Sequence, residues 1–161
     1  MIDDEIKLGA IICIVIVGFI VISPLIEARV LIDPYSELGI LGPNGVVGGY
    51  PNKVVQMEPF NLTLYVGNHE GRAQYYRILA KVGDKAQNVT ENLPYNATVI
   101  ASWDILLPTD RNTTLPIQMI IKQPGLNRRL VFELYRYDPT IDSFVYHHRW
   151  NQVWMNVTSP N

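Results

Sequence analysis

The feature that most restricts the possible folds of this chain is an uncharged apolar run near the amino terminus. The run "LGAIICIVIVGFIVISPLI" extends over 19 residues from Leu8 to Ile26. As an α-helix it would be roughly 28 Å long, which matches the hydrocarbon core of a bilayer. A helix buried in a protein core would carry some polar face, and this run has none. The sequence therefore predicts one transmembrane helix over residues 8–28, with lipid contact through Leu8 to Ile26.

The residues around the run bear on other interpretations. A cleaved secretory signal usually has a basic leader and a shorter apolar core, whereas this chain opens with "MIDDEIK". We expect residues 1–7 to be a short cytoplasmic leader. A pilin-type helix, packed in the core of an extracellular filament, stays open as the alternative. The single cysteine, Cys13, lies inside the run, so the rest of the chain has no disulfide and no thiolate for chemistry.

Five N-x-S/T motifs indicate on which side of the membrane the remainder of the chain lies. About one such motif is expected by chance in a chain of this composition, and the pattern marks acceptors of N-linked glycans. All five lie after the apolar run. The sequence thus predicts a cell-membrane protein whose carboxy-terminal domain is extracytoplasmic and carries N-linked glycans. The acceptors are Asn61, Asn88, Asn96, Asn112 and Asn156.

The charged residues, 13 basic and 15 acidic, are scattered along the chain and form no basic stripe. Nucleic acid is therefore not an expected partner. Residues 29–50 are rich in glycine and proline, which is typical of a flexible linker. From residue 51 the sequence consists of short runs in which apolar and polar residues alternate.

The alternating runs predict an all-β fold. In "FNLTLYV" (60–66) and "AQYYRILAKV" (73–82) the apolar residues recur at every second position, the period of a half-buried strand. The short segment between them predicts a hairpin. We expect residues 51–161 to form an immunoglobulin-like antiparallel β-sandwich, preceded by the one membrane helix. Further expected strands are Thr98–Leu107, Leu115–Lys122, Arg129–Arg136, Ser143–His148 and Asn151–Val157.

Two pairs of adjacent polar residues are the first candidates for chemistry. His69 and Glu70 could act as acid and base, but neighbouring strand residues point to opposite faces. A turn explains the tetrapeptide "NHEG" better, because Gly71 supplies a left-handed position. His147 and His148 likewise face apart, and a metal needs further ligands. We expect no catalytic residue, no metal and no cofactor.

Two weaker possibilities concern the rest of the domain. An envelope hydrolase would need a site assembled across strands from Glu70, Asp104, Glu133 or His147. The aromatic residues of the carboxy-terminal third would suit glycan or partner binding if exposed, but core and cross-strand packing is the expected role. Trp150 and Trp154 share strand parity, so they are expected to form one patch. The other members of the set are Tyr135, Tyr137, Phe144 and Tyr146.

Five segments in order carry a resemblance to a known family: "ELGILGPNG", "YP", "VGNHEGRAQYY", "RLVFELYR" and "WNQVWMNV". They are similar to the extracytoplasmic part of the archaeal membrane-protein family known as domain of unknown function 1616, from about Ser36 to Val157. The resemblance implies an archaeal cell-surface β-sandwich with no assigned activity and no catalytic residues to transfer. It marks Asn68, His69, Glu70 and Gly71 as a family hallmark turn.

Together these observations predict a single-pass, N-glycosylated cell-envelope protein whose sandwich is a binding or structural module. Its expected partners are proteins of the membrane or envelope, and it is a candidate accessory subunit of a larger complex.

Overall fold

The computed structural model describes residues 16–18, 20, 33–86 and 88–160. The chain divides into two compact units, Met1–Asp33 and Pro34–Asn161. Of the predicted membrane span, the described residues 16–18 and 20 are helical; the rest of residues 8–28 and the leader 1–7 lie outside the described residues. Among the residues that are described, no helix reaches the length and apolar character needed to cross a bilayer.

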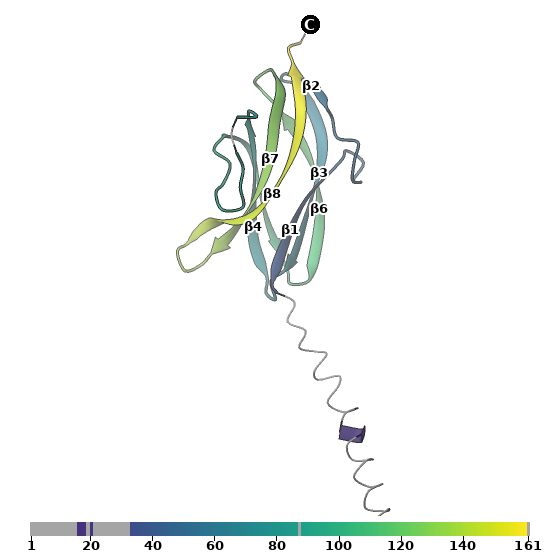
Figure 1. Ribbon diagram of the computed structural model, residues 1–161, viewed down its shortest axis with the longest axis vertical. Coiled ribbons are helices and arrows are strands. Elements are labelled where there is room, and N and C mark those ends of the chain that lie inside the picture. Colours follow the sequence, from purple (N-terminus) through teal and green to yellow (C-terminus); the bar gives the residue numbers. More distant parts are fainter. Residues whose placement is uncertain (1–15, 19, 21–32, 87, 161) are drawn as a thin grey trace, which may run out of the picture. The chain divides into compact units, whose positions relative to one another are not determined.

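The described part of the second unit is all-β and has two sheets, as Figure 1 shows. One sheet has three strands in the order β1-β3-β6, and the other has five in the order β2-β8-β7-β4-β5. The all-β, two-sheet part of the prediction is confirmed. The strands are β1 (Tyr35–Leu41), β2 (Lys53–Val55), β3 (Pro59–His69), β4 (Gln74–Gly83), β5 (Thr98–Leu107), β6 (Arg111–Ile120), β7 (Gly125–Asp138) and β8 (Ser143–Thr158).

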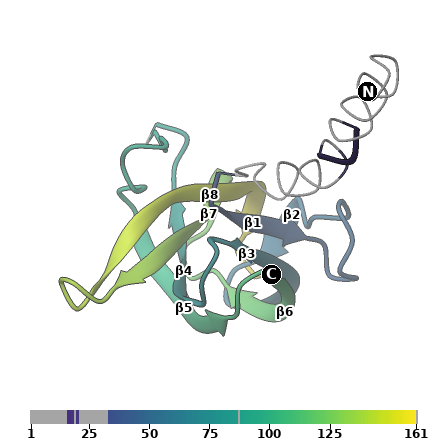
Figure 2. The ribbon, with the colours of Figure 1, turned by 90° about the horizontal axis from the view of Figure 1, so that it is seen from below.

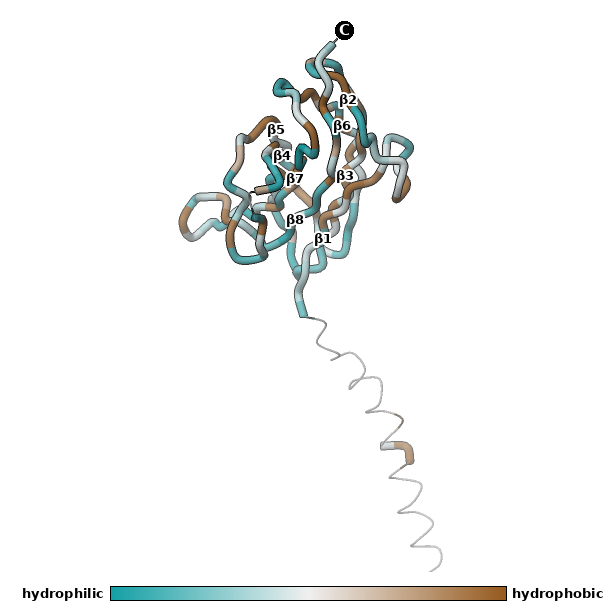
Figure 3. Tube along the Cα trace, turned by 45° about the horizontal axis from the view of Figure 1, so that its top comes forward, coloured by the Kyte–Doolittle hydropathy of each residue, from teal (hydrophilic) through white to brown (hydrophobic). Residues whose placement is uncertain are grey.

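One hydrophobic core lies between the sheets. The alternating apolar residues of β3, including Leu64 and Val66, join those of β4 and β7, including Ile78 and Phe132, in a single buried cluster. Each side chain of this kind stabilises the fold by about 1.5–3 kcal/mol through its removal from water. In Figure 3 brown hydrophobic stretches run along parts of β1, β3 and β5.

The sandwich is mixed rather than strictly antiparallel. Strand β2 pairs in parallel with β8, where Val54 lies opposite Val157. Val54 is buried in the core with only 7% of its surface exposed. The prediction of a purely antiparallel fold is wrong at this edge, because a three-residue strand is too short to show an alternating pattern.

The predicted linker over residues 29–50 is wrong for Tyr35–Leu41, which form β1 and pair with β3. Ser36 and Ile40 are buried, and a Cβ added at Gly39 would lie 3.4 Å from the Tyr65 Cβ, in ordinary contact with that side chain. The glycine-rich stretch proper begins at Gly42, whose N–H donates to the Val46 carbonyl at 2.8 Å. Composition alone did not separate the strand from the loop that follows it.

The predicted hairpin at "NHEG" is also wrong. Strand β3 pairs with β1 and β6, whereas β4 pairs with β5 and β7, so the bend at residues 70–72 carries the chain from one sheet to the other. Alternation shows that a segment is a strand but not which strand it pairs with. Gly71 has a φ of 72°, as the turn prediction required.

The remaining strands follow the prediction with changed ends. The bounds of β5 are those expected, while β6 begins at Arg111 and β7 extends in both directions. The two predicted strands at 143–148 and 151–157 are one strand, β8. The pairing register between β7 and β8 shifts between Leu134 and Tyr135 of β7, and His148 of β8 has a φ of 55°. These irregularities bend β8 without ending it.

A long connection lies against the outer face of the five-stranded sheet. We call it the 84–97 loop; residue 87 is outside the described residues. The Tyr146 hydroxyl of β8 donates to the Thr90 carbonyl at 3.1 Å, and a ring nitrogen of His148 contacts the Glu91 carbonyl. Figures 1 and 2 show this loop on one side of the sheet and the β7–β8 hairpin extending beyond the other strands.

Candidate functional site

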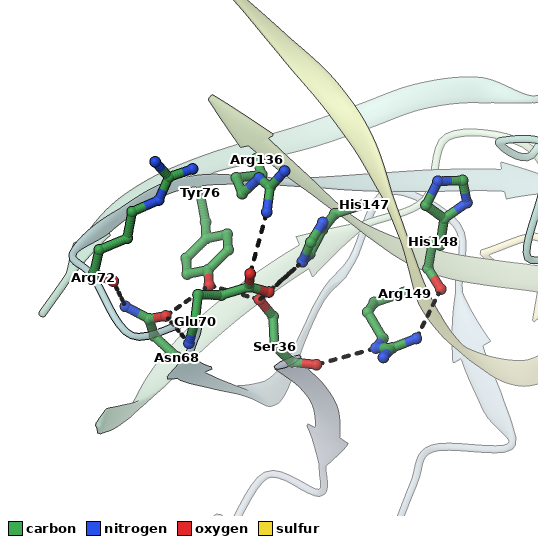
Figure 4. Close-up of polar contacts among 9 residues, drawn as sticks. All are labelled: Ser36, Asn68, Glu70, Arg72, Tyr76, Arg136, His147, His148 and Arg149. Atoms are coloured by element: carbon green, nitrogen blue, oxygen red, sulfur yellow. Dashed lines mark hydrogen bonds and ion pairs between the residues drawn. The ribbon is translucent and has the colours of Figure 1, made fainter. Parts of the chain in front are cut away.

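A buried polar cluster joins the two sheets at the end where β1 begins. We call it the Ser36–Glu70 cluster, and Figure 4 shows its side chains converging. Ser36 comes from β1, Glu70 from the bend after β3, Tyr76 from β4 and His147 from β8. Ser36 and Asn68 occupy strand positions whose side chains face the interior of the sandwich. Such positions usually hold apolar residues, and here they hold polar ones. The members are Ser36, Asn68, Glu70, Tyr76, Arg136 and His147.

The Glu70 carboxylate is the centre of this cluster. Its Oε1 accepts from the Ser36 hydroxyl at 2.7 Å and lies 2.9 Å from Nε2 of His147. Its Oε2 lies 3.2 Å from a guanidinium nitrogen of Arg136. The Ser36 hydroxyl is also 2.7 Å from the Tyr76 hydroxyl. Every oxygen of this nearly buried carboxylate thus has a partner, which burial of a charge requires.

The environment changes the acidity of both titratable groups at the centre. Burial raises the pKa of Glu70, but the hydrogen bonds from Ser36 and His147 and the charge of Arg136 outweigh it, so the pKa lies below its ordinary value. Burial lowers the pKa of His147, and the neighbouring Glu70 only partly offsets this. Near neutral pH the cluster therefore holds an ionised Glu70 beside a neutral His147.

Serine, histidine and glutamate meet here, but not in the arrangement of a hydrolase. In a nucleophilic triad the acid holds one ring nitrogen of the histidine and the serine contacts the other. Here Ser36 and Glu70 both contact Nε2 of His147, at 2.9 Å each. A neutral His147 that donates from Nε2 to the carboxylate has no lone pair there to accept the Ser36 proton. Ser36 is also only 2% exposed.

Asn68 ties the bend to the rest of the cluster. Its amide nitrogen is within hydrogen-bond distance of the carbonyls of Arg72, Leu107 and Pro108, at 2.8 to 3.0 Å. Its side-chain oxygen accepts from the Glu70 backbone N–H at 3.1 Å. These contacts fix the hallmark turn against the end of β5. The geometry describes a structural clasp between sheets.

The other sequence candidates lie apart from the cluster. His69 turns away from Glu70, stacks on Tyr35 at 4.6 Å and lies 3.6 Å from Glu37. His148 turns away from His147, as expected for strand neighbours. Asp104 pairs with Arg77 on β4, and Glu133 lies in a second cluster described next. Among the described residues no group of three or more metal-ligating side chains is present.

A second polar cluster holds the 84–97 loop on the outer face. The Lys81 ammonium lies 2.7 Å from Glu133 Oε2 and donates to the Tyr95 carbonyl at 2.9 Å. The Glu133 carboxylate accepts from the Tyr95 backbone N–H and from the Tyr135 hydroxyl. The two charged side chains are 8% and 0% exposed. Burial, followed by the charge of Glu133, raises the pKa of Tyr135 far above its ordinary value.

The glycan acceptors predicted from the sequence differ in accessibility. Asn61, Asn88, Asn96 and Asn112 are exposed. Asn156 is half-buried in β8, between β2 and β7, and its side-chain oxygen accepts from the Asn127 N–H at 2.9 Å. The expectation of exposure therefore holds for four acceptors, and Asn156 departs from it because both neighbouring strands pair there.

The carboxy-terminal aromatic residues are not part of the core between the sheets, so that part of the prediction is wrong. They line the outer face of the five-stranded sheet, where the expected cross-strand packing is found. Tyr135 and Tyr146 have ring centroids 5.6 Å apart. The Arg129 guanidinium lies over the rings of both Trp150 and Trp154, at 5.7 and 5.3 Å, so these two residues do share a patch.

Comparison with known proteins adds one decisive finding. Residues 32–156 match the family described as a domain of unknown function, DUF1616. The chain belongs to the DUF1616 family. The match includes both polar clusters and the hallmark turn. No curated protein matches the sequence.

Solved structures similar to this DUF1616 chain are distant. The CARDB domain of the PF1109 protein from Pyrococcus furiosus, solved in complex with di-metal ions, has 12% identity and a TM-score of 0.48, over 79% of this chain and 96% of that one. A β-glucosidase from Listeria innocua has 11% identity and a TM-score of 0.46, over 78% of this chain and 16% of that one. The sporulation control protein Spo0M from Bacillus subtilis has 8% identity and a TM-score of 0.45, over 76% and 49%. Similarities at this level say nothing about ligand or activity.

Proposed function

We propose that this DUF1616 protein is a single-pass, N-glycosylated cell-envelope protein whose outer β-sandwich is a binding or structural module. The membrane helix is the apolar run from Leu8 to Ile26, and the sandwich lies outside the cell. The observation that carries the proposal is the exposure of four of the five acceptor asparagines on a folded domain. An occupied acceptor must face solvent, because a glycan is bulky and hydrophilic.

The positions of these acceptors support the same conclusion. Asn61 lies near the start of β3 and Asn112 near the start of β6, opposite Gly67 toward the other end of β3. Asn88 and Asn96 lie on the 84–97 loop, over the five-stranded sheet. Glycans at these places would lie on more than one face of the domain. This arrangement suits a cell-surface domain that contacts its partners through the patches left free of glycans.

A binding or structural role fits the chemistry of the described residues better than catalysis. The Ser36–Glu70 cluster uses its serine, histidine and carboxylate to join strands of the two sheets. The Lys81–Glu133 pair uses its charges to hold a loop. Both sets are buried and satisfied, so neither presents a reactive atom to a substrate.

The proposal is tested by purification from native membranes in a mild detergent, with mass spectrometry of the intact chain and of the proteins that accompany it. We expect the chain in the membrane fraction, with added hexose and with a defined set of membrane or envelope proteins. Wild-type membranes without a tag on the chain serve as the control for adventitious partners. A fibrous product shortened at its amino terminus would instead make the chain a filament subunit.

A further inference from the structure

A shallow pocket lies on the outer face of the five-stranded sheet, along the turn end of the β7–β8 hairpin. Its volume is about 450 Å³, within the range of small-molecule sites. The 84–97 loop contacts residues further along the same face and does not line this pocket. The lining includes Arg77, Tyr135, Tyr137, Asp142, Ser143 and Phe144.

Aromatic rings form one part of this hairpin pocket. Tyr137 packs edge-on against Phe144 with ring centroids 5.5 Å apart, and Tyr75, which does not line the pocket, packs beside Phe144 with ring centroids 5.2 Å apart. Tyr75 is 39% exposed, and the other two rings are half-buried. The pocket thus presents ring surface that is packed against neighbouring rings and partly open to solvent.

Fixed polar groups form the other part. The Arg77 guanidinium lies 4.1 Å above the Phe144 ring and binds Asp104 through two hydrogen bonds of 2.7 Å. These use two of the five N–H bonds of an arginine. The Tyr137 hydroxyl donates to the Asp142 carboxylate, which is exposed at the rim. The pocket therefore offers both donors and acceptors beside its rings.

We propose that this pocket binds a neutral hexopyranose of a surface glycan. A pyranose has an apolar face of C–H groups that packs on an aromatic ring and hydroxyls that both donate and accept. The hairpin pocket has the matching halves: rings from Tyr137 and Phe144, donors from Arg77 and an acceptor from Asp142. This inference rests on the proposed function, since it names the ligand class of the surface module.

The charges favour a neutral sugar over an anion. Asp104 balances the Arg77 charge by direct pairing, and Asp142 adds a negative charge at the rim. A phosphate or a nucleic acid would meet that carboxylate without a free cation in return. A hydroxylated neutral ligand meets no such repulsion.

The test is saturation-transfer NMR titration of the full chain with methyl α-D-mannopyranoside and methyl α-D-glucopyranoside. The chain is produced without glycans and held in a phosphocholine detergent, so that neither its own sugars nor a sugar headgroup fills the pocket. We expect binding of at least one sugar with a Kd on the order of 1 mM. Failure of both sugars to bind would overturn the inference.

Two variants show whether binding occurs at this pocket. Tyr137→Ala removes a ring and is expected to weaken binding about tenfold. Asp142→Asn keeps the exposed turn, since asparagine tolerates its φ of 51°, and is expected to weaken binding several-fold through loss of the charged acceptor. Trp154→Ala is the matched control, because Trp154 lies on the same face, is as exposed as Tyr75, and is outside the pocket.

Equal affinity of both pocket variants and the wild type would contradict the inference. The measured affinity for sugar does not depend on where the chain resides in the cell. A chain that binds sugar but carries no glycan in native membranes would refute the proposed envelope glycoprotein and leave the pocket assignment intact. A glycosylated membrane protein that binds neither sugar would refute the pocket assignment and leave the proposed envelope glycoprotein intact.

Discussion

At the scale of single residues, His147 makes the fold sensitive to acid. Its burial lowers its pKa in the folded state below the ordinary value of 6.5. The unfolded chain therefore binds a proton at a pH where the folded chain does not, so stability is present above pH 6.5 and is lost as pH falls below it. The depressed pKa of Glu70 extends the loss to more acidic pH.

This gives a prediction for the melting temperature, Tm, of the chain. We expect Tm to fall between pH 7.5 and pH 5, and His147→Gln to lose most of that dependence because glutamine does not titrate. Differential scanning calorimetry over the pH series is the measurement. His148→Gln, at the exposed neighbour, is the control and should keep the wild-type slope. The same slope in both variants would exclude His147 as the titrating group.

A second residue-scale prediction concerns the Ser36 hydroxyl. Ser36→Ala removes a donor to Glu70 and leaves a buried carboxylate less satisfied, which costs about 1–3 kcal/mol of unfolding free energy. Urea unfolding of the variant measures the change. Ser102→Ala, at an exposed position of β5, should change the free energy by less than about 0.5 kcal/mol. A Ser36→Ala variant as stable as wild type would show that the hydroxyl contributes nothing to the clasp.

Residue patterns predicted only part of this site. The bend at residues 70–72, the left-handed Gly71 and the divergence of His69 from Glu70 follow from local rules and are present in the structure, whereas the hairpin predicted there is not. The meeting of Glu70 with Ser36 and His147 joins residues 34 to 111 positions apart, and no local rule reaches so far. A polar residue at an inward-facing strand position, as at Ser36 and Asn68, was the available signal for a buried network.

At the scale of elements, the Lys81–Glu133 pair decides whether the 84–97 loop stays on the sheet. Lys81→Met leaves the Glu133 carboxylate buried without its cation, which costs about 3–5 kcal/mol. We expect a matching loss in urea unfolding and faster hydrogen exchange at the Tyr95 amide. The half-exposed pair Arg77–Asp104 is the control, because Asp104→Ala removes a surface ion pair worth about 1 kcal/mol and leaves Arg77 stacked on Phe144.

Equal losses for Lys81→Met and Asp104→Ala would contradict the role assigned to the buried pair. Unchanged exchange at Tyr95 would show that other contacts hold the loop.

Elements were predicted better than their pairing. Strand β5 has the expected bounds because alternation and flanking turn residues agree there. The partner of each strand was not predictable, since β3 and β4 are neighbours in sequence and belong to different sheets. The strand β1 was hidden because its segment "YSELGIL" borders a glycine-rich loop and was interpreted with it.

At the scale of the whole molecule, the predicted glycan acceptors differ in exposure. Asn61, Asn88, Asn96 and Asn112 have exposed side chains, whereas Asn156 lies in a strand paired on both sides. We expect at least two of the exposed acceptors to carry sugar in the native protein. Asn156 should be unmodified, because its half-buried side chain lies in a strand paired on both sides, which leaves little room for a glycan on its amide nitrogen.

Glycopeptide mass spectrometry of the protein from native membranes is the decisive test of these expectations. We expect hexose-containing glycans on at least two of the four exposed asparagines, none on Asn156, and recovery of the chain with the membrane fraction after a high-pH wash. Unmodified peptides at all five acceptors, or recovery of the chain in the soluble fraction, would contradict the assignment to the outer surface of the cell.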